Sequence, residues 1–575
     1  MSDLLNSASL VLIPSGYKED TVYSVVPSDG SGDMAFTRAS NGTRVNSAGL
    51  VEVCPWNLLQ QSETFDNATW QKSGINVTAN SVANPLTGLI NADNLVADTG
   101  NNFHYIYQPI TYTTDQHTIF VYLKANGYNW FVIDSGLSNK YSYYNLSTGV
   151  LGTAGSGATA SIESAGNGWY KCGVTFAGVA GSTGIYLSVR NADNGGAFTG
   201  NGTGGILAYG AQLNIGSTAK PYFPTTDRLN VPRLTYQNGG GGCPSLLLEK
   251  QSTNKCPSSN NFGTSAVQTT VTRNVTTSPA GVSDADRLLD TSANDEHLFG
   301  QNFDSITNGL TYTISVFFKA DGSGGRGVIR YYGGEWVYAV YNLATGVVSF
   351  SEGSITTKIE NYGNGWYRCM LTHTAIMDYT PMVTQIGIAN SSNQFSYQGA
   401  SNLGVYFWGF QAEQSSYVTS LIETNGSSAT RVADACFKTG ISSLIGQTEG
   451  VLFVDVNLST RNIAGFYFGL RDLSIPNYIM FFIGTSSIIA QVYNSGSALL
   501  YSTFTNNSTG RFKIAIAYKN NDFVFYANGS LIGSATSGTV PTCNELFNGE
   551  EYSINQFYLS KTRLTNAELA SLTTI

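Results

Sequence analysis

Apolar and polar residues alternate with a period of two along much of the chain. Two stretches show the alternation best, each with three apolar side chains on one face: Ile119, Val121 and Leu123, and Ile314, Val316 and Phe318. A period of two is typical of a β-strand that buries one face. Turn residues interrupt the pattern at short intervals, so the chain is predicted to be all-β with very little helix.

The strand pattern is duplicated along the chain. The segment Gly166–Cys172 (GNGWYKC) recurs as Gly363–Cys369 (GNGWYRC), and Tyr144–Val150 (YNLSTGV) recurs as Tyr341–Val347 (YNLATGV). Both pairs have the same spacing of 197 residues, and weaker matches occur on either side in the same order. A repeat of this length predicts two tandem β-sandwiches of the jelly-roll or concanavalin type.

The repeat divides the chain into four predicted parts. A glycine run at Gly239–Gly242 marks a flexible joint between the two copies. The parts are an N-terminal segment 1–53, a first sandwich 54–236, a second sandwich 237–438 and a third sandwich 439–575.

The third sandwich has its own pattern. Phe512–Tyr518 alternates like a strand, and Asn528-Gly529 between two apolar runs is a strong hairpin signal. Near the end, Thr565 and Glu568 have the spacing of a capping box, flanked by apolar Leu564 and Leu569. This ending predicts one short helix.

Composition and charge exclude several classes of protein. Apolar residues make up 42 %, too many for a disordered chain. Charged residues make up 12 %, about half of the usual ~25 %. A net charge of −9 argues against binding to nucleic acid. No apolar run approaches the ~18 residues of a membrane span, and the N-terminus lacks the features of a secretory signal. We therefore expect neither membrane insertion nor secretion.

Neither the cysteines nor the polar loops indicate a metal site. The seven cysteines are odd in number and form no Cys-x-x-Cys pair, which indicates free thiols rather than disulfides or a zinc site. The loop Asn191–Asn194 could hold Ca²⁺, although turn chemistry explains its composition better. We predict no cofactor and no metal.

The repeated histidines His104 and His297 allow two interpretations. They could form a repeated ligand contact, or they could be structural side chains satisfied at a sheet edge, which we favour. For catalysis, scattered acidic residues could still meet as a carboxylate pair in space. No nucleophile motif with its partners occurs in the required order, and we predict that the protein is not an enzyme.

Aromatic residues near the repeated strands are the candidate ligand contacts. Flat aromatic rings can stack on the apolar face of a sugar, but a sandwich core needs such rings equally. Tyr141 and Tyr338 are repeat equivalents, as are Tyr144 and Tyr341. The predicted ligand-binding residues are Trp130, Tyr141, Trp336 and Tyr338. Trp169 and Trp366, beside the repeated Cys172 and Cys369, are predicted core residues.

Three sets of residues carry resemblances to known families. The repeated GNGWY(K/R)C segments resemble carbohydrate-binding-module-like sandwiches, which occur in tandem in bacteriophage fibre proteins. Phe512–Gly529 is similar to the hairpin of laminin-G and concanavalin-A-like domains. The phrases Thr37–Asn46 (TRASNGTRVN) and Pro232–Glu249 resemble segments of virion proteins of crAss-like phages of gut bacteria.

These resemblances imply a virion surface appendage, with a head fibre favoured over a tail fibre. The N-terminal segment would attach it to other virion proteins of the capsid or tail. The sandwiches would bind host-surface glycans weakly and multivalently as a homotrimer, at the virion surface after synthesis in the host cytoplasm. Two alternatives remain: a purely structural capsid decoration without glycan affinity, and a polysaccharide-degrading enzyme with accessory modules.

Overall fold

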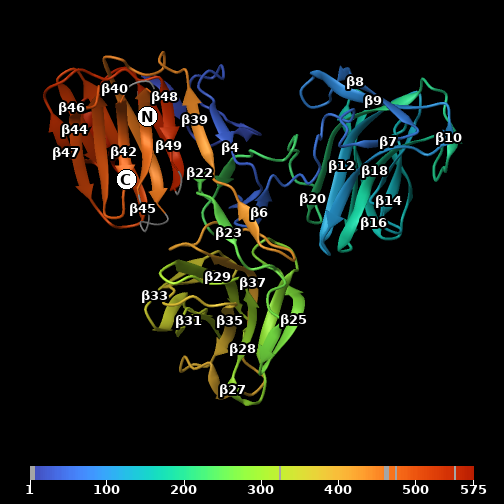
Figure 1. Ribbon diagram of the computed structural model, residues 1–575. Coiled ribbons are helices and arrows are strands. Elements are labelled where there is room, and N and C mark those ends of the chain that lie inside the picture. The colour runs from blue at the N-terminus through green and yellow to red at the C-terminus, as the bar shows by residue number, and fades with distance from the viewer. Residues whose placement is uncertain (1–6, 323–324, 459–464, 473–475, 550–551) are drawn as a thin grey trace. The chain divides into compact units, whose positions relative to one another are not determined.

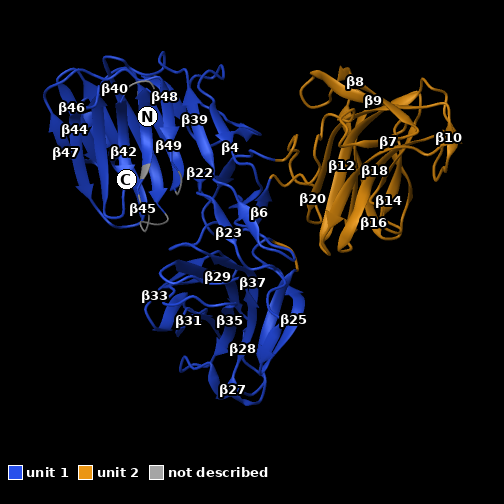
Figure 2. Cartoon of the chain, viewed as in Figure 1, with its two compact units in different colours: residues 1–54, 229–280, 284–575 blue, residues 55–228, 281–283 orange. Residues whose placement is uncertain are grey.

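The computed structural model describes residues 7–322, 325–458, 465–472, 476–549 and 552–575. The chain divides into two compact units (Figure 2): unit 1 comprises residues 1–54, 229–280 and 284–575, and unit 2 comprises residues 55–228 and 281–283. Nearly all regular structure in the described residues is antiparallel β-sheet, and the helix α2 (Asn566–Thr573) lies near the C-terminus (Figure 1). The predicted all-β class is confirmed.

Unit 2 is the first sandwich. One six-stranded sheet has the order β15 (Val150–Ala154), β14 (Tyr141–Asn145), β13 (Trp130–Asp134), β18 (Gly181–Arg190), β11 (His104–Tyr112) and β7 (Gln71–Ser73). The other has the order β16 (Ala158–Gly166), β17 (Trp169–Ala177), β12 (Gln116–Asn126), β20 (Gly205–Ile215), β9 (Ile90–Ala97) and β8 (Ile75–Ala83). A small ribbon pairs β10 (Asn101–Asn102) with β19 (Phe198–Thr199).

The second sandwich, in unit 1, repeats this topology strand for strand. One six-stranded sheet has the order β32 (Val347–Glu352), β31 (Trp336–Asn342), β30 (Arg326–Tyr332), β35 (Met382–Ala389), β28 (Leu298–Phe303) and β24 (Ser265–Val267). The other has the order β33 (Ile355–Asn361), β34 (Trp366–Thr374), β29 (Thr311–Ala320), β37 (Gly404–Glu413), β26 (Ala285–Asp290) and β25 (Thr269–Thr276). The ribbon is β27 (Asn294–Glu296) with β36 (Ser396–Gln398). The identical strand order supports the duplication inferred from the sequence.

The third sandwich, also in unit 1, has larger sheets. One contains β21 (Arg233–Thr235), β22 (Ser245–Leu248), β49 (Tyr552–Ser560), β40 (Glu449–Leu458), β45 (Gly510–Lys519), β46 (Asp522–Ala527) and β47 (Ser530–Ala535), with β1 (Ala8–Leu12) also paired to β49. The other contains β2 (Tyr17–Lys18), β3 (Thr21–Val22), β4 (Met34–Thr37), β39 (Ala435–Thr439), β48 (Glu545–Asn548), β41 (Phe466–Asp472), β42 (Asn477–Ile483), β43 (Ser487–Asn494) and β44 (Ser497–Thr505). Two further two-stranded sheets pair β5 (Gly42–Val45) with the next strand β6 (Val51–Cys54), and β23 (Ser252–Asn254) with the distant β38 (Ala429–Arg431).

The N-terminal segment is part of the third sandwich rather than a separate element. Leu10 and Phe36 are fully buried in the same apolar core as Val454 and Ile516. Unit 2 begins at residue 55, one residue from the predicted start of the first sandwich. The segments 8–37, 233–248 and 435–439 all contribute strands to the third sandwich, so the structure differs from the predicted separate N-terminal segment and from the predicted boundaries at 236 and 438. An apolar strand is most stable when both its backbone bonds and its apolar face are satisfied, and here the partners lie hundreds of residues away.

The predicted local features of the third sandwich are confirmed. Asn528 and Gly529 both have positive φ, 48° and 81°, as a two-residue turn between β46 and β47 requires. The Thr565 side chain accepts a hydrogen bond from the Glu568 backbone, and the Thr565 backbone donates to the Glu568 carboxylate at 2.7 Å. Helix α2 packs on the outer face of β45 and β46 through Leu569.

The cores of the two repeated sandwiches use the alternation seen in the sequence. Ile119, Val121 and Leu123 are fully buried in the first core, and their counterparts on β29 are fully buried in the second. No helix among the described residues is long and apolar enough to cross a lipid bilayer.

Candidate functional site

The repeated sandwiches each expose the outer face of one six-stranded sheet. On β13 of the first sandwich, Phe131 and Ile133 point into the core, so Trp130 and Asp134 lie on the opposite face. All four predicted ligand residues lie on such outer faces, Trp130 and Tyr141 in the first sandwich and Trp336 and Tyr338 in the second. These two outer faces are therefore the candidate binding surfaces.

Three tyrosines form the largest aromatic group on the first outer face. Tyr107 and Tyr186 stack with ring centroids 5.1 Å apart, and Tyr105 contacts Tyr186 edge-on at 5.4 Å. All three rings are half-buried, and the Tyr107 hydroxyl donates a hydrogen bond to the Gln71 side chain. We call Tyr105, Tyr107 and Tyr186 the tyrosine face. It offers flat, partly exposed rings with hydroxyl groups at their rims.

A single carboxylate lies beside the tyrosine face. Asp134 is directly opposite Tyr186 on one neighbouring strand and Tyr141 on the other. Burial raises the pKa of the Asp134 carboxyl, while the Gly136 N–H, 2.8 Å from it, and Arg190 act in the opposite direction. Burial likewise raises the pKa of Tyr186, helped by Tyr105, Tyr107 and Asp134, so its hydroxyl stays neutral.

Trp130 and Tyr141 are only partly exposed to a ligand on the outer face of the first sandwich. Trp130 is half-buried against β15, where a Cβ at Gly152 would come within 2.6 Å of the indole ring. Gly152 therefore leaves room for the indole ring to extend across β14 as far as β15. The Tyr141 ring is also half-buried and contacts the Tyr143 ring edge-on at 5.9 Å.

The second outer face has a different set of aromatic residues. The Trp336 side chain is 41 % exposed, and its ring lies 3.9 Å from the guanidinium carbon of Arg330. Tyr338 is half-buried between Phe350, at 5.5 Å, and Phe395, at 4.9 Å. Burial, followed by a hydrogen bond to Glu352, raises the pKa of Tyr338 to about 12. Trp336 is thus the more accessible of these two predicted contacts.

Tyr144 and Tyr341 are core residues rather than ligand contacts. Both side chains are fully buried, and each hydroxyl donates to a backbone carbonyl of the facing sheet, Gly173 at 2.7 Å and Met370 at 2.6 Å. The predicted core positions of Trp169 and Trp366 are confirmed, since both are at least 97 % buried. Pairing of the hydroxyl inside the core is what allows a buried tyrosine at this position.

The repeated histidines have the structural role that we favoured. His104 is fully buried, and its ring nitrogens contact the carbonyls of Gly74 and, at 2.9 Å, Phe198. His297 is fully buried in the same way, with Gln268 at 2.7 Å and Tyr397 at 3.2 Å. Each imidazole fastens the β10–β19 or β27–β36 ribbon to the sheet edge and is not exposed to a ligand.

The described residues contain no group of three or more His, Cys, Asp or Glu side chains arranged to hold a metal ion. In the oxygen-rich loop 191–194, the Asp193 carboxylate accepts hydrogen bonds from the Thr153 N–H at 2.8 Å and the Thr153 hydroxyl at 3.1 Å. These bonds support the turn interpretation of that loop. Burial raises the pKa of Cys172 and Cys369 well above the ordinary thiol value, so both remain unreactive thiols.

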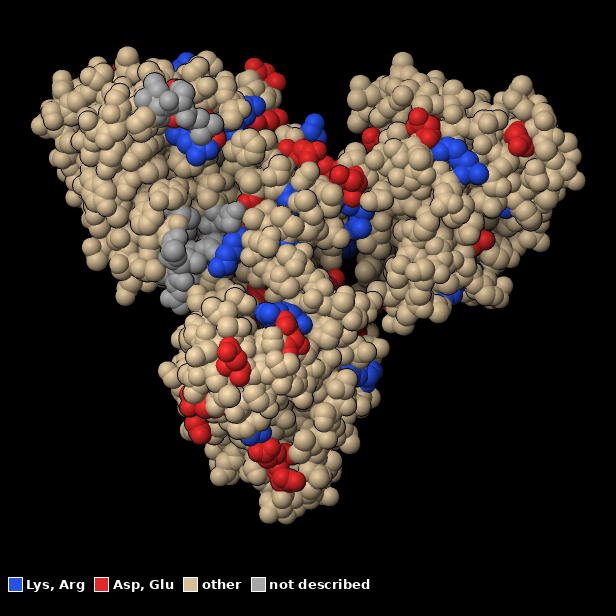
Figure 3. Space-filling view, viewed as in Figure 1, with Lys and Arg blue, Asp and Glu red and all other residues tan. Residues whose placement is uncertain are grey.

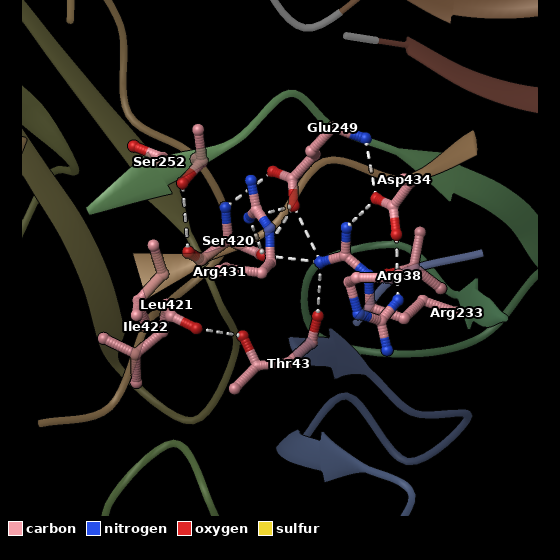
Figure 4. Close-up of polar contacts among 12 residues, drawn as sticks. Arg38, Thr43, Arg233, Glu249, Ser252, Ser420, Leu421, Ile422, Arg431 and Asp434 are labelled. Carbon is pink, nitrogen blue, oxygen red and sulfur yellow. Dashed lines mark hydrogen bonds and ion pairs between the residues drawn. The ribbon is translucent and has the colours of Figure 1, made fainter. Parts of the chain in front are cut away.

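A buried cluster of charges lies elsewhere in unit 1 (Figure 4). Asp434 accepts hydrogen bonds from Arg38 Nη1 at 2.9 Å and from Arg233, and Glu249 accepts from Arg233 and Arg431, both at 2.7 Å. The three arginine side chains and Asp434 have no exposed surface. We call these five residues the ionic cluster.

Backbone and hydroxyl groups complete the ionic cluster. Ser420 donates to Glu249 from its N–H at 2.7 Å and from its hydroxyl at 2.6 Å. Burial by itself would raise the pKa of Glu249, but Arg431 and Arg233 outweigh it and lower that pKa to about 2. Since a buried charge is tolerated only when paired and hydrogen-bonded, the cluster is a structural joint between distant chain segments.

The ionic cluster and the tyrosine face were both missed by the sequence analysis. Residues 37–46 and 232–249 supply Arg38, Arg233 and Glu249, three of the five charges, and the recurrence of Thr-Arg at 37–38 and 430–431 was the available signal for Arg431. For the tyrosine face, the signal was the alternation of Tyr105 and Tyr107 on one strand. Tyr186 could not be added without knowing that β11 pairs with β18.

Charged side chains are sparse on the face of the molecule that Figure 3 shows. Lys, Arg, Asp and Glu are scattered there among other residues, without a field of one sign. This face therefore gives no support for binding through broad electrostatic attraction.

Comparisons with known proteins are weak. No family model and no curated protein matches the chain. Among solved structures, the sialyllactose-bound CBM40 of the Ruminococcus gnavus IT-sialidase is 14 % identical, covering 24 % of this chain and 91 % of its own, with a TM-score of 0.19.

Laminin domains give similar values. The LG4-5 domains of the mouse laminin α1 chain are 10 % identical, covering 47 % of this chain and 85 % of theirs, with a TM-score of 0.16. The LG1-3 region of the laminin α2 chain is 9 % identical, covering 80 % and 96 %, with a TM-score of 0.15. At these values the likenesses carry no argument about function, which has to come from the chain's own residues.

Proposed function

We propose that this protein is a non-catalytic, glycan-binding appendage of a phage virion surface. The observation that carries the glycan-binding part is the tyrosine face of the first sandwich. Its three half-buried rings are held by mutual contacts, so binding a sugar would cost little side-chain entropy. The rings offer apolar faces to C–H groups, and Gln71, Asp134 and the phenol hydroxyls offer hydrogen bonds to sugar hydroxyls.

The virion part of the proposal rests on the resemblance of residues 37–46 and 232–249 to phage virion segments. We favour a head fibre over a tail fibre. Because residues 8–37 are strands of the third sandwich, we propose that this composite sandwich, rather than a free N-terminal segment, contacts other virion proteins. A homotrimer at the virion surface would present several weak sites at once and gain affinity by avidity.

A purely structural decoration is the second candidate. The ionic cluster favours it, because it commits five buried charges to joining chain segments rather than to a ligand. A spacer protein needs such joints, whereas it has no need of partly exposed tyrosines. The two candidates therefore differ in what they expect from the tyrosine face.

Binding of the full-length protein to a panel of bacterial surface polysaccharides tests the proposal. We expect Tyr107→Ala and Tyr186→Ala each to weaken binding about tenfold, since loss of one stacking contact costs on the order of 1 kcal/mol. Tyr501→Ala, which removes a 59 % exposed tyrosine from the third sandwich, is the matched control and should bind like the parent protein. Absence of binding across the panel would favour the structural decoration.

Immunogold labelling of purified particles tests the virion assignment separately. We expect label on the particle surface, on the capsid for a head fibre or on the tail for a tail fibre. Unlabelled particles from a preparation that contains the protein in the lysate would contradict the assignment. Release of reducing ends from bound polysaccharide would instead revive the enzyme alternative.

A further inference from the structure

The two outer faces differ at their centre by a reversal of charge. Asp134 of the first sandwich lies opposite Tyr141 and Tyr186 on its two neighbouring strands. In the second sandwich, Arg330 lies opposite Tyr338 and Gln385 in the equivalent register. Duplication preserved the strand pairing, so the position is the same and only its chemistry has changed.

The tyrosine face is also absent from the second sandwich. The stacked pair Tyr107 and Tyr186 corresponds to Gly300 and Gln385, which face each other on β28 and β35. A Cβ at Gly300 would come within 2.8 Å of the Gln385 Cγ, so the start of the Gln385 side chain leaves no room for a larger residue at position 300. The second face therefore does not present the same ligand contacts as the first.

Arg330 is held rigidly on this face. Its Nη1 donates to Glu296 at 3.0 Å and to Gln385 at 3.3 Å. The guanidinium carbon lies 3.9 Å from the Trp336 ring and 5.3 Å from the Phe395 ring, so the planar group is sandwiched among aromatic side chains. Only 13 % of the side chain is exposed, although it is not part of the core.

One edge of this guanidinium is unused within the described residues. Both of its side-chain bonds to Glu296 and Gln385 leave from Nη1, and Nε is buried with no hydrogen-bond partner. Because Nε is buried, a ligand cannot reach it, and Nη2 is the nitrogen of this group that neither is buried nor has a hydrogen-bond partner among the described residues. A positively charged N–H donor of this kind makes a charge-assisted hydrogen bond to a carboxylate, and here it lies beside an exposed tryptophan.

We infer that the outer face of the second sandwich binds a carboxylate-bearing glycan, such as a uronate polysaccharide. The Nη2 group of Arg330 receives the carboxylate, and the 41 % exposed Trp336 ring stacks on the sugar. The first sandwich, with Asp134 at the equivalent position, takes uncharged sugars on its tyrosine face. This inference rests on the proposed glycan-binding function and adds the class of ligand for each face.

Binding measurements with paired ligands test this inference. The probes are polygalacturonate, alginate and hyaluronate oligosaccharides, each compared with the same material after chemical reduction of its carboxyl groups. We expect at least one acidic probe to bind the full-length protein about tenfold more tightly than its reduced form, the usual value of a charge-assisted pair. Raising the salt concentration should weaken only the acidic member of the pair.

Variants assign this preference to Arg330. Arg330→Gln should abolish the preference, and Arg330→Lys should retain part of it, because lysine keeps the charge but loses the planar group that stacks on Trp336. Glu296→Gln should strengthen binding of the acidic probe, since it removes a competing carboxylate. Arg287→Gln, which breaks the Arg287–Asp321 ion pair on the other sheet of the same sandwich, is the matched control and should leave the preference unchanged.

The outcomes separate the inference from the proposed function. If neutral glycans bind through Tyr107 while no acidic probe is preferred, the inference is wrong and the proposed function stands. If acidic probes are preferred but Arg330→Gln and Glu296→Gln have no effect, the assignment to this face is also wrong. If neither acidic nor neutral glycans bind, both fail. Should Arg330→Gln not fold, the lysine variant and the opposite effect of Glu296→Gln still decide the question.

Discussion

One pair of facing core positions holds different residue types in the two repeated sandwiches. In the first sandwich, His117 on β12 lies opposite Phe176 on β17, and its Nδ1 contacts the Asp115 carbonyl at 2.9 Å. In the second, the same two positions hold Tyr312 and His373, and the His373 Nδ1 contacts the Ser354 carbonyl at 3.1 Å. The imidazole has moved to the other strand of the pair. Each copy thus keeps one buried imidazole at this pair of positions, bonded to a loop carbonyl.

The burial of His117 predicts a pH dependence of stability. Burial lowers the pKa of His117 below its ordinary 6.5, opposed by the Asp115 carbonyl and carboxylate and aided by Lys140. A histidine with a lowered folded pKa binds fewer protons when folded, so stability falls as pH drops below about 6.5 through the folded pKa. We expect the melting temperature of the first sandwich to fall over this range, and His117→Phe to flatten the fall. An equal slope in both proteins would contradict the prediction.

Strand and turn elements carry the local stability of the third sandwich. The Asn528-Gly529 turn and the capped helix α2 meet, because the Gly529 N–H donates to the Thr573 hydroxyl at 3.1 Å. A Cβ at Gly529 would lie 3.2 Å from the Thr574 hydroxyl, and the residue has a φ of 81°. The hairpin and the helix are therefore coupled through this glycine.

Substitution at Gly529 tests the turn. We expect Gly529→Ala to lower the free energy of unfolding by about 1–2 kcal/mol, since L-residues are strained at positive φ. The measurement is denaturant unfolding, monitored by the circular dichroism of the backbone. Ser530→Ala, at the neighbouring exposed position, is the control and should change stability little. A neutral Gly529→Ala would show that the turn relaxes to another type.

Substitution at Thr565 tests the helix start. Thr565→Ala removes the side-chain acceptor of the Glu568 N–H and should cost about 1 kcal/mol of helix stability. Faster hydrogen exchange of the first-turn amides of α2 would report this loss. Ser571→Ala, on an exposed position of the same helix, should leave those exchange rates unchanged. Equal rates in the parent protein and Thr565→Ala would contradict the prediction.

On the scale of the whole molecule, the ionic cluster is where distant parts of the sequence meet. Its charges come from residues 38, 233, 249, 431 and 434, all of which belong to unit 1. Thr43, in the same segment as Arg38, adds a hydrogen bond from its hydroxyl to the Leu421 carbonyl at 2.6 Å. Residues 37–46 and 232–249 thus help to join distant segments within unit 1.

Removing a charge from the ionic cluster tests how much the cluster contributes to the free energy of unfolding. Glu249→Gln leaves Arg233 and Arg431 buried without their carboxylate and should cost about 3–5 kcal/mol. Glu360→Gln, which breaks the exposed pair with Lys358, is the matched control and should cost less than about 1 kcal/mol. Both values come from denaturant unfolding of unit 1. A cost for Glu249→Gln no larger than that of the control would contradict the joint role.

Acid titration of the same variant provides a second test. A carboxylate whose folded pKa is lowered contributes stability above its unfolded pKa of about 4.5, and that stability is lost as pH falls toward about 2. We expect unit 1 to lose stability over this window, and Glu249→Gln to lose less of it. Parallel curves for the two proteins would exclude Glu249 as the responsible group.

Much of the fold could be predicted because its signals are local. Alternation at Ile119–Leu123 assigns strand and buried face together, and the GNGWY(K/R)C repeat shows the duplication without any tertiary information. The predicted core positions of Trp169 and Trp366 are confirmed by their burial, whereas the contact of Trp130, Tyr141, Trp336 and Tyr338 with a ligand stays a prediction. The tyrosine face was missed because it needs residues from two strands that pair across nearly eighty residues.

The sequence by itself determined the all-β class, the two repeated sandwiches, the Asn-Gly hairpin and the capped C-terminal helix. Each depends on side-chain periodicity or on bonds between near neighbours, so the information lies within a few residues. The tertiary structure alone decided that residues 8–37 complete the third sandwich, that five charges from distant segments pair in one place, and that Asp134 and Arg330 occupy equivalent positions. These features depend on which strands satisfy one another's backbone bonds and apolar faces, and periodicity does not encode the choice of partner.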